Sequence, residues 1–306
     1  MALVENFVTV VGVLTILRFF SRFVETVARI INESLWSKTF DFKKFGTWAV
    51  VTGASDGIGK ATSYELAKAG MNLVILARTK SKLDKFADEL RQSFNVRVIV
   101  IAVDFSNGED IYDVINEELR DLDIALLVNN VGMAFGKPMS FMDVPEYRKY
   151  STNVVNVNVL AAMKMTEIVL PNMVKKGGGI ITNISSLVAS MNGAYFSVYG
   201  GSKAAINAYT EAMQNEYSNK GIIFQLIAPG LTVTPMALTY TDLKPNLLIP
   251  VSELYGKHVV KSLGKSSHTN TGFFGHNVFK LFINLIPDFL AAKINGSEAA
   301  KFKPNK

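Results

Sequence analysis

Short apolar runs alternate with helical stretches between residue 46 and about residue 230. Six runs are β-branched and nearly continuous in apolarity: "TWAVVT", "NLVILA", "VRVIVIA", "IALLVN", "GIITNIS" and "IIFQLIA". Runs of this kind are typical of strands that are buried on both faces. Stretches such as "KATSYELAKAG" and "SKLDKFADELRQSF" lie between them. The alternation predicts an α/β fold in which helices cover a parallel sheet.

The two ends of the chain depart from this pattern. Residues 7–20, "FVTVVGVLTILRFF", are almost wholly apolar, and extending them to Leu3 and Val24 gives about the length of a bilayer span. Residues 272–294 are apolar and aromatic but interrupted by polar residues, which favours an interfacial helix or a lid over an apolar site. We therefore predict a membrane anchor and linker at 1–45, a catalytic domain at 46–235, and a substrate loop with an irregular apolar C-terminal extension at 236–306.

The charges around the apolar run give the anchor an orientation. Glu5 precedes the run, and the cations Arg18, Arg22, Arg29, Lys38, Lys43 and Lys44 lie near its end or follow it. A cleaved signal peptide has its positive charge on the other side of the apolar stretch. Because positive charge gathers on the cytosolic side of a membrane, most of the chain is expected to face the cytosol. An amphipathic helix that lies on the membrane is the alternative.

Composition excludes several kinds of chemistry. The chain of 306 residues has no cysteine, which rules out disulfides, cysteine-ligated zinc, iron–sulfur clusters and thiol catalysis. His258, His268 and His276 show no metal-ligand spacing, so no metal site is predicted. The net charge of +6 comes without any nucleic-acid-binding motif, so no nucleic-acid partner is expected.

A glycine-rich turn follows the first apolar run in "VVTGASDGIGKAT". Gly53, Gly57 and Gly59 would let the backbone approach a pyrophosphate, and the N-terminus of the following helix favours an anion. The spacing is G-x-x-x-G-x-G rather than the commoner G-x-G-x-x-G. The turn predicts a dinucleotide site, with Gly53, Ser55, Asp56, Gly57, Ile58 and Gly59 as its residues.

The end of the second run indicates which dinucleotide binds. An acidic residue there would bind the ribose diol of NAD, but "LVILARTKSK" has Arg78, followed by Lys80 and Lys82. Cations suit the 2′-phosphate of NADPH/NADP+, and Arg78 and Lys82 are the predicted ligands. A solvated basic turn is the alternative interpretation.

Two further loops are expected to shape the cofactor cleft. Asp104 in "AVDFS" ends the third run, where it would meet the adenine edge. Asn129, Asn130 and Gly132 in "LVNNVG" end the fourth run, and Asn130 is the predicted cofactor contact. Each signal is weak alone, since such turns are ordinary strand endings.

The segment "YFSVYGGSK" holds the candidate proton donor. Tyr199 and Lys203 are four residues apart, so they share one face of a helix. A phenol has a pKa of about 10, which a neighbouring ammonium lowers, and the pair is then suited to proton transfer. Tyr195 has no lysine four residues after it and is expected to be a pocket wall or a core aromatic.

The ordered motifs "TGASDGIG", "NNVG", "NISS" and "YGGSK" resemble the short-chain dehydrogenase/reductase family over about residues 46–235. The resemblance implies a Rossmann-type doubly wound parallel sheet and a catalytic set of serine, tyrosine, lysine and asparagine. It selects Ser186 rather than Ser185, together with Tyr199, Lys203 and Asn158, with Asn156 as the near alternative to the last.

The resemblance also implies a role for each of these residues in ketone reduction. Ser186 would orient the carbonyl oxygen as it gains charge, and Tyr199 would protonate it. Lys203 would lower the pKa of Tyr199 and hold the nicotinamide ribose, while Asn158 would hold a water that links Lys203 to solvent. In "APGLTVTPM", the residues expected at the nicotinamide end are Pro229, Gly230 and Thr232, with Tyr199 and Lys203 also touching the cofactor.

With its apolar N-terminus, "ILARTKSKLDKFADEL" and "MKMTEIVLPNMVKKGGGIITNISS", the chain is similar to one membrane-bound branch of that family. The branch contains very-long-chain 3-oxoacyl-CoA reductases and 17-beta-hydroxysteroid dehydrogenases of the endoplasmic reticulum. It implies NADPH-dependent reduction of a long-chain 3-oxoacyl-CoA in fatty acid elongation, on the endoplasmic reticulum membrane, with a homodimer and an elongation complex as further assemblies. The alternatives are a steroid, retinoid or other lipid-ketone dehydrogenase, and a non-catalytic nucleotide-binding scaffold.

Overall fold

The chain forms two compact units, Met1–Lys38 and Thr39–Lys306. The computed structural model describes residues 2–35, 40–136, 138–191, 194–239, 242–265 and 270–285. The proposed boundaries at residues 45 and 235 remain predictions.

The first unit is a single helix, α1 (Ala2–Leu35), of 34 residues. Its stretch Val4–Ser21 has a mean hydropathy of 1.5, and none of it is buried. Phe7, Ile16 and Phe20 are each more than 60% exposed. Large apolar side chains that are exposed along such a stretch favour apolar surroundings.

Six parallel strands form one sheet in the second unit, in the order β3-β2-β1-β4-β5-β6. They are β1 (Trp48–Thr52), β2 (Asn72–Ala77), β3 (Val98–Ala102), β4 (Ile124–Asn129), β5 (Gly179–Ile184) and β6 (Ile222–Ile227). These are the six apolar runs of the sequence. In β1, Val51 pairs with Ile75 of β2 on one side and with Val128 of β4 on the other. The strand order therefore reverses at β1, where open α/β sheets form their ligand crevice.

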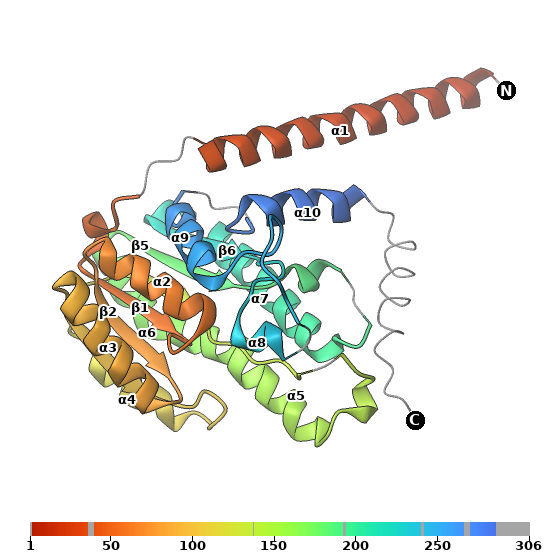
Figure 1. The fold of residues 1–306 in the computed structure, drawn as a ribbon. Helices are drawn as coiled ribbons and strands as arrows, with labels where there is room; N and C mark the ends of the chain where they lie inside the picture. Colours follow the sequence, from red (N-terminus) through yellow and green to blue (C-terminus); the bar gives the residue numbers. More distant parts are fainter. Residues whose placement is uncertain are drawn as a thin grey trace. The chain divides into compact units, whose positions relative to one another are not determined.

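Helices cover both faces of this sheet (Figure 1). On one face lie α2 (Gly57–Lys68), α3 (Lys80–Phe94) and α9 (Ser252–Ser262), which bury Leu66, Phe86 and Tyr255 against the strands. On the other face lie α4 (Asp110–Leu119), α6 (Ala161–Lys176) and α7 (Ser197–Tyr217). A second core forms there, to which α4 contributes Ile115 and α6 contributes Met165. The doubly wound parallel sheet predicted from the sequence is confirmed.

The remaining helical elements complete this unit. They are η1 (Phe42–Phe45), η2 (Phe141–Asp143), α5 (Tyr147–Val155), η3 (Asn156–Leu160), η4 (Leu187–Ser190), η5 (Ser218–Lys220), α8 (Pro235–Leu238) and α10 (Phe274–Leu285). The stretch Tyr147–Lys176 is long and apolar enough to cross a membrane, but half of it is buried in this unit. It is thus a core helix, in which η3 is a π-helical turn.

The C-terminal extension is more regular than expected. Helix α9 packs closely on α2, where a Cβ on Gly256 would lie 2.6 Å from Ala61. Val259 and Leu263 are fully buried against the sheet. After α9, Asn270 forms a parallel bridge with Ile227 and so extends the edge of the sheet at β6. Residues 286–306 lie outside the described residues.

Candidate active site

A cavity of about 730 Å³ lies at the carboxyl ends of the strands. The loop after each strand contributes to its lining, because the ends of parallel strands meet at one edge of the sheet. Fourteen predicted cofactor residues line it: Gly53, Ser55, Asp56, Gly57, Ile58, Arg78, Lys82, Asp104, Asn130, Tyr199, Lys203, Pro229, Gly230 and Thr232. Ser186 lines it as well, whereas Gly59 and Asn158 do not.

The glycine turn is shaped by contacts between loops. Gly53 has φ +67°, and a Cβ there would lie 2.9 Å from the Cα of Val131. At Gly59 a Cβ would lie 2.3 Å from both the Gly53 carbonyl oxygen and the Asn130 Nδ2. Gly59 is therefore required for packing under the turn, rather than for approach to a ligand as expected. Asn130 braces the same turn, since its Nδ2 donates to the carbonyls of Thr52 at 3.0 Å and Gly53 at 3.2 Å.

Helix α2 points its N-terminus toward this cavity, as its lining by Gly57 and Ile58 indicates. The residue before it, Asp56, makes no side-chain capping hydrogen bond, and the first turn has no acidic residue. The N–H groups that begin a helix need acceptors from outside it, and an anion is a suitable one.

Carboxylates accompany both cations at the predicted 2′-phosphate position. Lys82 Nζ lies 2.7 Å from Asp56 Oδ2, and Arg78 Nη1 lies 3.8 Å from Asp104 Oδ2. The Arg78 side chain is 78% exposed. Burial acts to raise the pKa of Asp104, but hydrogen bonds from Ser106 and the Arg78 charge outweigh it and hold this pKa below its ordinary value. The Asp104 carboxylate is thus already engaged, and the region is less basic than the sequence suggested.

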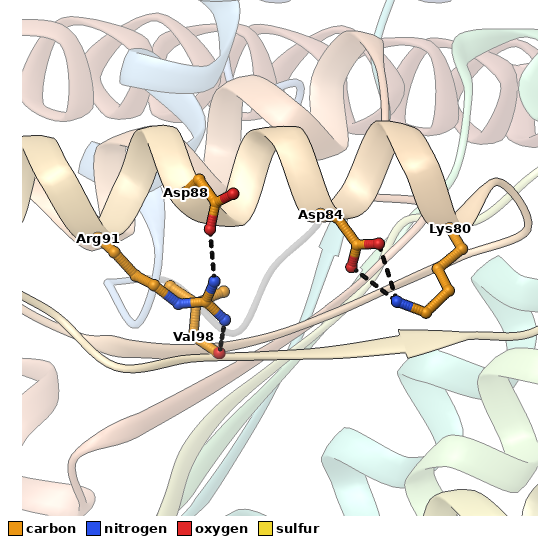
Figure 2. A network of polar contacts seen from close by, with 5 residues as sticks. All are labelled: Lys80, Asp84, Asp88, Arg91 and Val98. Atoms are coloured by element: carbon orange, nitrogen blue, oxygen red, sulfur yellow. Dashed lines mark hydrogen bonds and ion pairs between the residues drawn. The ribbon is translucent and has the colours of Figure 1, made fainter.

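Lys80, the third cation of this segment, does not line the cavity. It forms an ion pair with Asp84, one turn along α3, at 2.8 Å (Figure 2). The same view shows Arg91 bound to Asp88 and to the Val98 carbonyl oxygen, which fastens α3 to β3. Lys80 therefore belongs to the surface of α3.

Tyr199 lies in the first turn of α7, next to Ser186. Burial raises the pKa of Tyr199, and a hydrogen bond from the Ser186 side chain opposes the rise only in part. Ser186 Oγ also accepts a hydrogen bond from the Val188 N–H at 3.2 Å. Ser185 has a different environment, because its buried hydroxyl hydrogen-bonds within the protein to the Lys203 carbonyl and to Asn207. The geometry therefore favours Ser186 over Ser185.

Lys203 is 4% exposed, and its ammonium lies 5.9 Å from the centre of the Tyr199 ring. Nζ donates to the Ile184 carbonyl oxygen at 2.9 Å. Burial lowers the pKa of Lys203 to about 8. The expected lowering of the Tyr199 pKa is not found, since the ammonium is directed at the end of β5 rather than at the phenol and burial dominates.

Asn158 lies in the π-helical turn η3, beneath the loop after β4. Its Oδ1 accepts from the Met133 N–H at 2.7 Å, and its Nδ2 donates to the Met133 carbonyl at 3.0 Å and to Ser202 Oγ at 3.0 Å. A Cβ on Gly132 would lie 3.5 Å from both Asn158 Oδ1 and Lys203 Nζ. Asn158 thus joins the loop to α7 directly below Lys203, and π-helical turns are common at functional sites.

Apolar and aromatic side chains wall the site beside Tyr199. Leu231, Met236 and Phe279 belong to the cavity lining. A small adjoining pocket is lined by Phe135, Met139, Phe141, Val144, Tyr150, Tyr195, Phe196, Ser197, Val198 and Tyr199. Tyr195 is thus a pocket wall. The residues from 135 to 150 were missed from the sequence, where only their aromatic content could have signalled them.

Comparisons with known proteins agree with this geometry. The family model described as "short chain dehydrogenase" matches residues 47–244. The human very-long-chain 3-oxoacyl-CoA reductase is 39% identical over 249 residues, which are 81% of this chain and 78% of that protein. The human inactive hydroxysteroid dehydrogenase-like protein 1 is 37% identical over 257 residues, 84% of this chain and 77% of that protein.

Among solved structures, a short-chain dehydrogenase from Sphingobium yanoikuyae in complex with NADPH is similar. It has a TM-score of 0.62 at 29% identity, covering 68% of this chain and 80% of that one. The fold, the ordered motifs and these matches lead to one conclusion: the chain belongs to the short-chain dehydrogenase family of oxidoreductases.

Proposed function

We propose that this oxidoreductase uses NADPH to reduce the 3-keto group of long-chain 3-oxoacyl-CoA thioesters. The proposal rests mainly on one observation. Ser186, Tyr199 and Lys203 line the same cavity, which also has glycines and apolar side chains in its lining, and Asn158 lies beneath them. The relative named a very-long-chain 3-oxoacyl-CoA reductase supports the acyl-CoA substrate.

The residues present fit a dinucleotide. The uncapped N-terminus of α2 and the glycine turn would hold the diphosphate. Arg78 and Lys82 would hold the 2′-phosphate, while Pro229, Gly230 and Thr232 would face the nicotinamide end. The bound cofactor supplies a hydride. The similar structure solved with NADPH supports the same choice.

The ionisation of the site suits reduction. Because the pKa of Tyr199 is raised, its phenol is protonated at neutral pH and has a proton to donate to a ketone oxygen. Ser186, which lines the cavity together with Tyr199, would orient that oxygen. With a pKa of about 8, Lys203 is mostly charged at neutral pH and would stabilise negative charge on the phenol as the proton leaves.

The substrate would lie against the apolar walls near Tyr199. Leu231, Met236 and Phe279 offer one apolar side, and Phe135 and Tyr150 belong to another. Since these walls would also suit a rigid lipid, a hydroxysteroid, retinoid or other lipid ketone remains the second candidate. A nucleotide-binding scaffold is the third, and one relative is named inactive. A complete set of Ser186, Tyr199, Lys203 and Asn158 favours an enzyme.

The same proposal includes a cellular setting. Helix α1 would anchor the protein in the endoplasmic reticulum membrane, with the catalytic unit in the cytosol. There the enzyme would meet apolar acyl chains and other elongation enzymes, either as a monomer or as a homodimer.

A substrate series tests the proposal. Full-length protein is assayed for NADPH oxidation with 3-oxoacyl-CoA thioesters of increasing chain length and with a steroid ketone, all below their micelle-forming concentrations. If the chain is enclosed, each methylene contributes about 0.8 kcal/mol, so kcat/KM should rise about fourfold per added carbon until the pocket is filled. A flat series with good turnover of the steroid would favour the second candidate. NADPH binding without turnover of any ketone would favour the scaffold.

A further inference from the structure

A buried histidine in the C-terminal extension hydrogen-bonds to the loop that follows β6. His276 lies in the first turn of α10 and is 1% exposed. The Gly230 N–H donates to its Nδ1 at 3.1 Å, and its Nε2 lies 2.9 Å from the Leu231 carbonyl oxygen. Since Nδ1 accepts, Nε2 carries the proton and donates to Leu231. One neutral ring therefore holds two consecutive residues of the cavity lining.

The loop and the ring are fitted to each other. A Cβ on Gly230 would lie 2.8 Å from His276 Cδ2 and 3.1 Å from Cγ, so any larger residue at 230 would displace the ring. Burial lowers the pKa of His276 to about 4, which keeps the ring in the neutral form that this pair of hydrogen bonds requires. Residue 276 also lies outside the matched family region, residues 47–244.

Further hydrogen bonds connect this loop to the catalytic serine. The Pro229 carbonyl accepts from the Leu187 N–H at 2.9 Å, and Leu187 directly follows Ser186. On the other side, the Ala228 N–H donates to the Asn270 carbonyl at 2.8 Å, and the Asn270 N–H to the Leu226 carbonyl at 3.1 Å. The 228–231 loop is thus held between the turn of Ser186 and the segment that leads into α10.

We propose that His276 is a positioning residue for the nicotinamide end of the cofactor site. Its hydrogen bonds to Gly230 and Leu231 would fix the conformation of the loop that faces the nicotinamide. Helix α10 would in this way contribute to cofactor binding. This inference rests on the proposed use of NADPH. It requires that His276 act on one half of the cofactor only, because in the proposed function the loops after β1, β2 and β3 would bind the adenosine end.

The test compares a whole cofactor with its adenosine half. His276→Phe keeps an aromatic ring but removes both hydrogen bonds. Calorimetry measures the dissociation constants of NADPH and of 2′,5′-ADP, which lacks the nicotinamide. Two lost hydrogen bonds predict that NADPH binds about tenfold more weakly, while 2′,5′-ADP binding stays within about twofold of the wild-type value.

The matched control is His258→Phe. His258 lies in α9 and stacks edge-on against Phe273, as His276 does, with ring centres 5.2 Å apart in both pairs. In the described residues, His258 makes no hydrogen bond to the 228–231 loop, so its replacement should change neither constant. His276→Asn can still accept from Gly230 and should recover part of the NADPH affinity, which also covers the case in which the phenylalanine variant fails to fold.

The outcomes separate the two proposals. Equal weakening of NADPH and 2′,5′-ADP in both His276 variants, or no change in either, would overturn the positioning role. Wild-type protein that binds NADH and AMP instead would correct the proposed cofactor, and the same comparison with those ligands would still decide the role of His276.

Discussion

At the scale of single residues, Lys203 carries a positive charge at a buried position, where the loss of solvation disfavours the charged form. Its pKa is about 8 in the folded chain, against an ordinary value of 10.5. Below about pH 8 the ammonium is charged in both the folded and the unfolded chain, so the folded state carries the whole desolvation cost. As pH rises from about 8 to 10.5 the folded protein releases the proton first, and the cost is relieved. The burial of this charge therefore does not stabilise the fold, and we expect the role of Lys203 to be functional.

Lys203→Met should consequently stabilise the ligand-free protein while abolishing turnover. At pH 7 we expect a gain of about 1–3 kcal/mol in the free energy of unfolding, after the lost hydrogen bond to Ile184 is allowed for. Urea unfolding measures it. Lys80→Met, at an exposed ion pair, is the control and should change stability by less than about 0.5 kcal/mol. A clear loss of stability in Lys203→Met would mean that the charge is well solvated in the fold.

Arg78 is expected to determine the preference for NADPH over NADH. Its exposed side chain is free to reach a 2′-phosphate, and its nearest carboxylate, Asp104, is 3.8 Å away. Arg78→Asp would leave Lys82 as the one predicted phosphate ligand, itself paired with Asp56. The kcat/KM ratio of NADPH to NADH should fall about tenfold to a hundredfold, the range of a charge-assisted hydrogen bond.

Lys80→Asp makes the same change of charge on α3, outside the cavity, and is the matched control. It should leave the ratio within about twofold of the wild-type value, because exposed charges at a distance are screened. An unchanged ratio in Arg78→Asp would remove Arg78 from the cofactor site.

The sequence was informative about residue types and less so about their partners. The glycine turn and the spacing of Tyr199 and Lys203 followed from local rules of strand, turn and helix. The ion pair of Lys82 with Asp56 joins residues 26 apart, and such a contact has no local signal. The direction of the Tyr199 pKa was missed for a related reason, since burial and the path of the Lys203 ammonium depend on the assembled fold.

At the scale of elements, strands were easier to predict than the last helices. All six strands of the sheet are nearly continuous apolar runs, which few other structures produce. Helix α9 was missed because its segment "SELYGKHVVKS" is largely polar, with Tyr255, Val259 and Val260 as its buried apolar residues. Helix α10 is hydrogen-bonded to the loop after β6 through His276. In the sequence alone, this histidine is only a polar residue that interrupts an apolar stretch.

The docking of α10 should make stability depend on pH. The pKa of His276 falls from 6.5 to about 4 on folding, so the two states bind protons equally above about pH 6.5 and the unfolded state binds more below it. Stability should therefore decline as pH falls from 6.5 to 4, by up to about 3 kcal/mol from this residue.

Unfolding free energies across this range, for wild type and His276→Phe, measure that contribution. The variant should show a shallower decline. Part of the decline in stability that remains in His276→Phe would come from His258. Burial and the charges of Lys261 and Lys257 lower the pKa of His258 as well. Parallel curves for the two proteins would show that His276 does not titrate differently on folding.

At the scale of the whole molecule, the compact division at residue 38 separates an apolar helix from a catalytic unit. We expect α1 to tie the protein to a membrane with the rest of the chain in the cytosol, because cations gather at the end of the apolar run and beyond it. Protease added to sealed microsomes should digest the catalytic unit without detergent. Full protection until detergent is added would place that unit in the lumen and contradict the topology.

The most direct test of the central claim is the turnover of Tyr199→Phe with NADPH and a long-chain 3-oxoacyl-CoA. The variant keeps the ring and removes the one phenol that lies beside both Ser186 and Lys203 in the described structure. We expect kcat to fall by about 10²–10⁴-fold with the dissociation constant of NADPH little changed, whereas Tyr195→Phe, altered at a pocket wall, should keep most of its turnover. Near-normal turnover in Tyr199→Phe together with an inactive Tyr195→Phe would contradict the assignment of the proton donor.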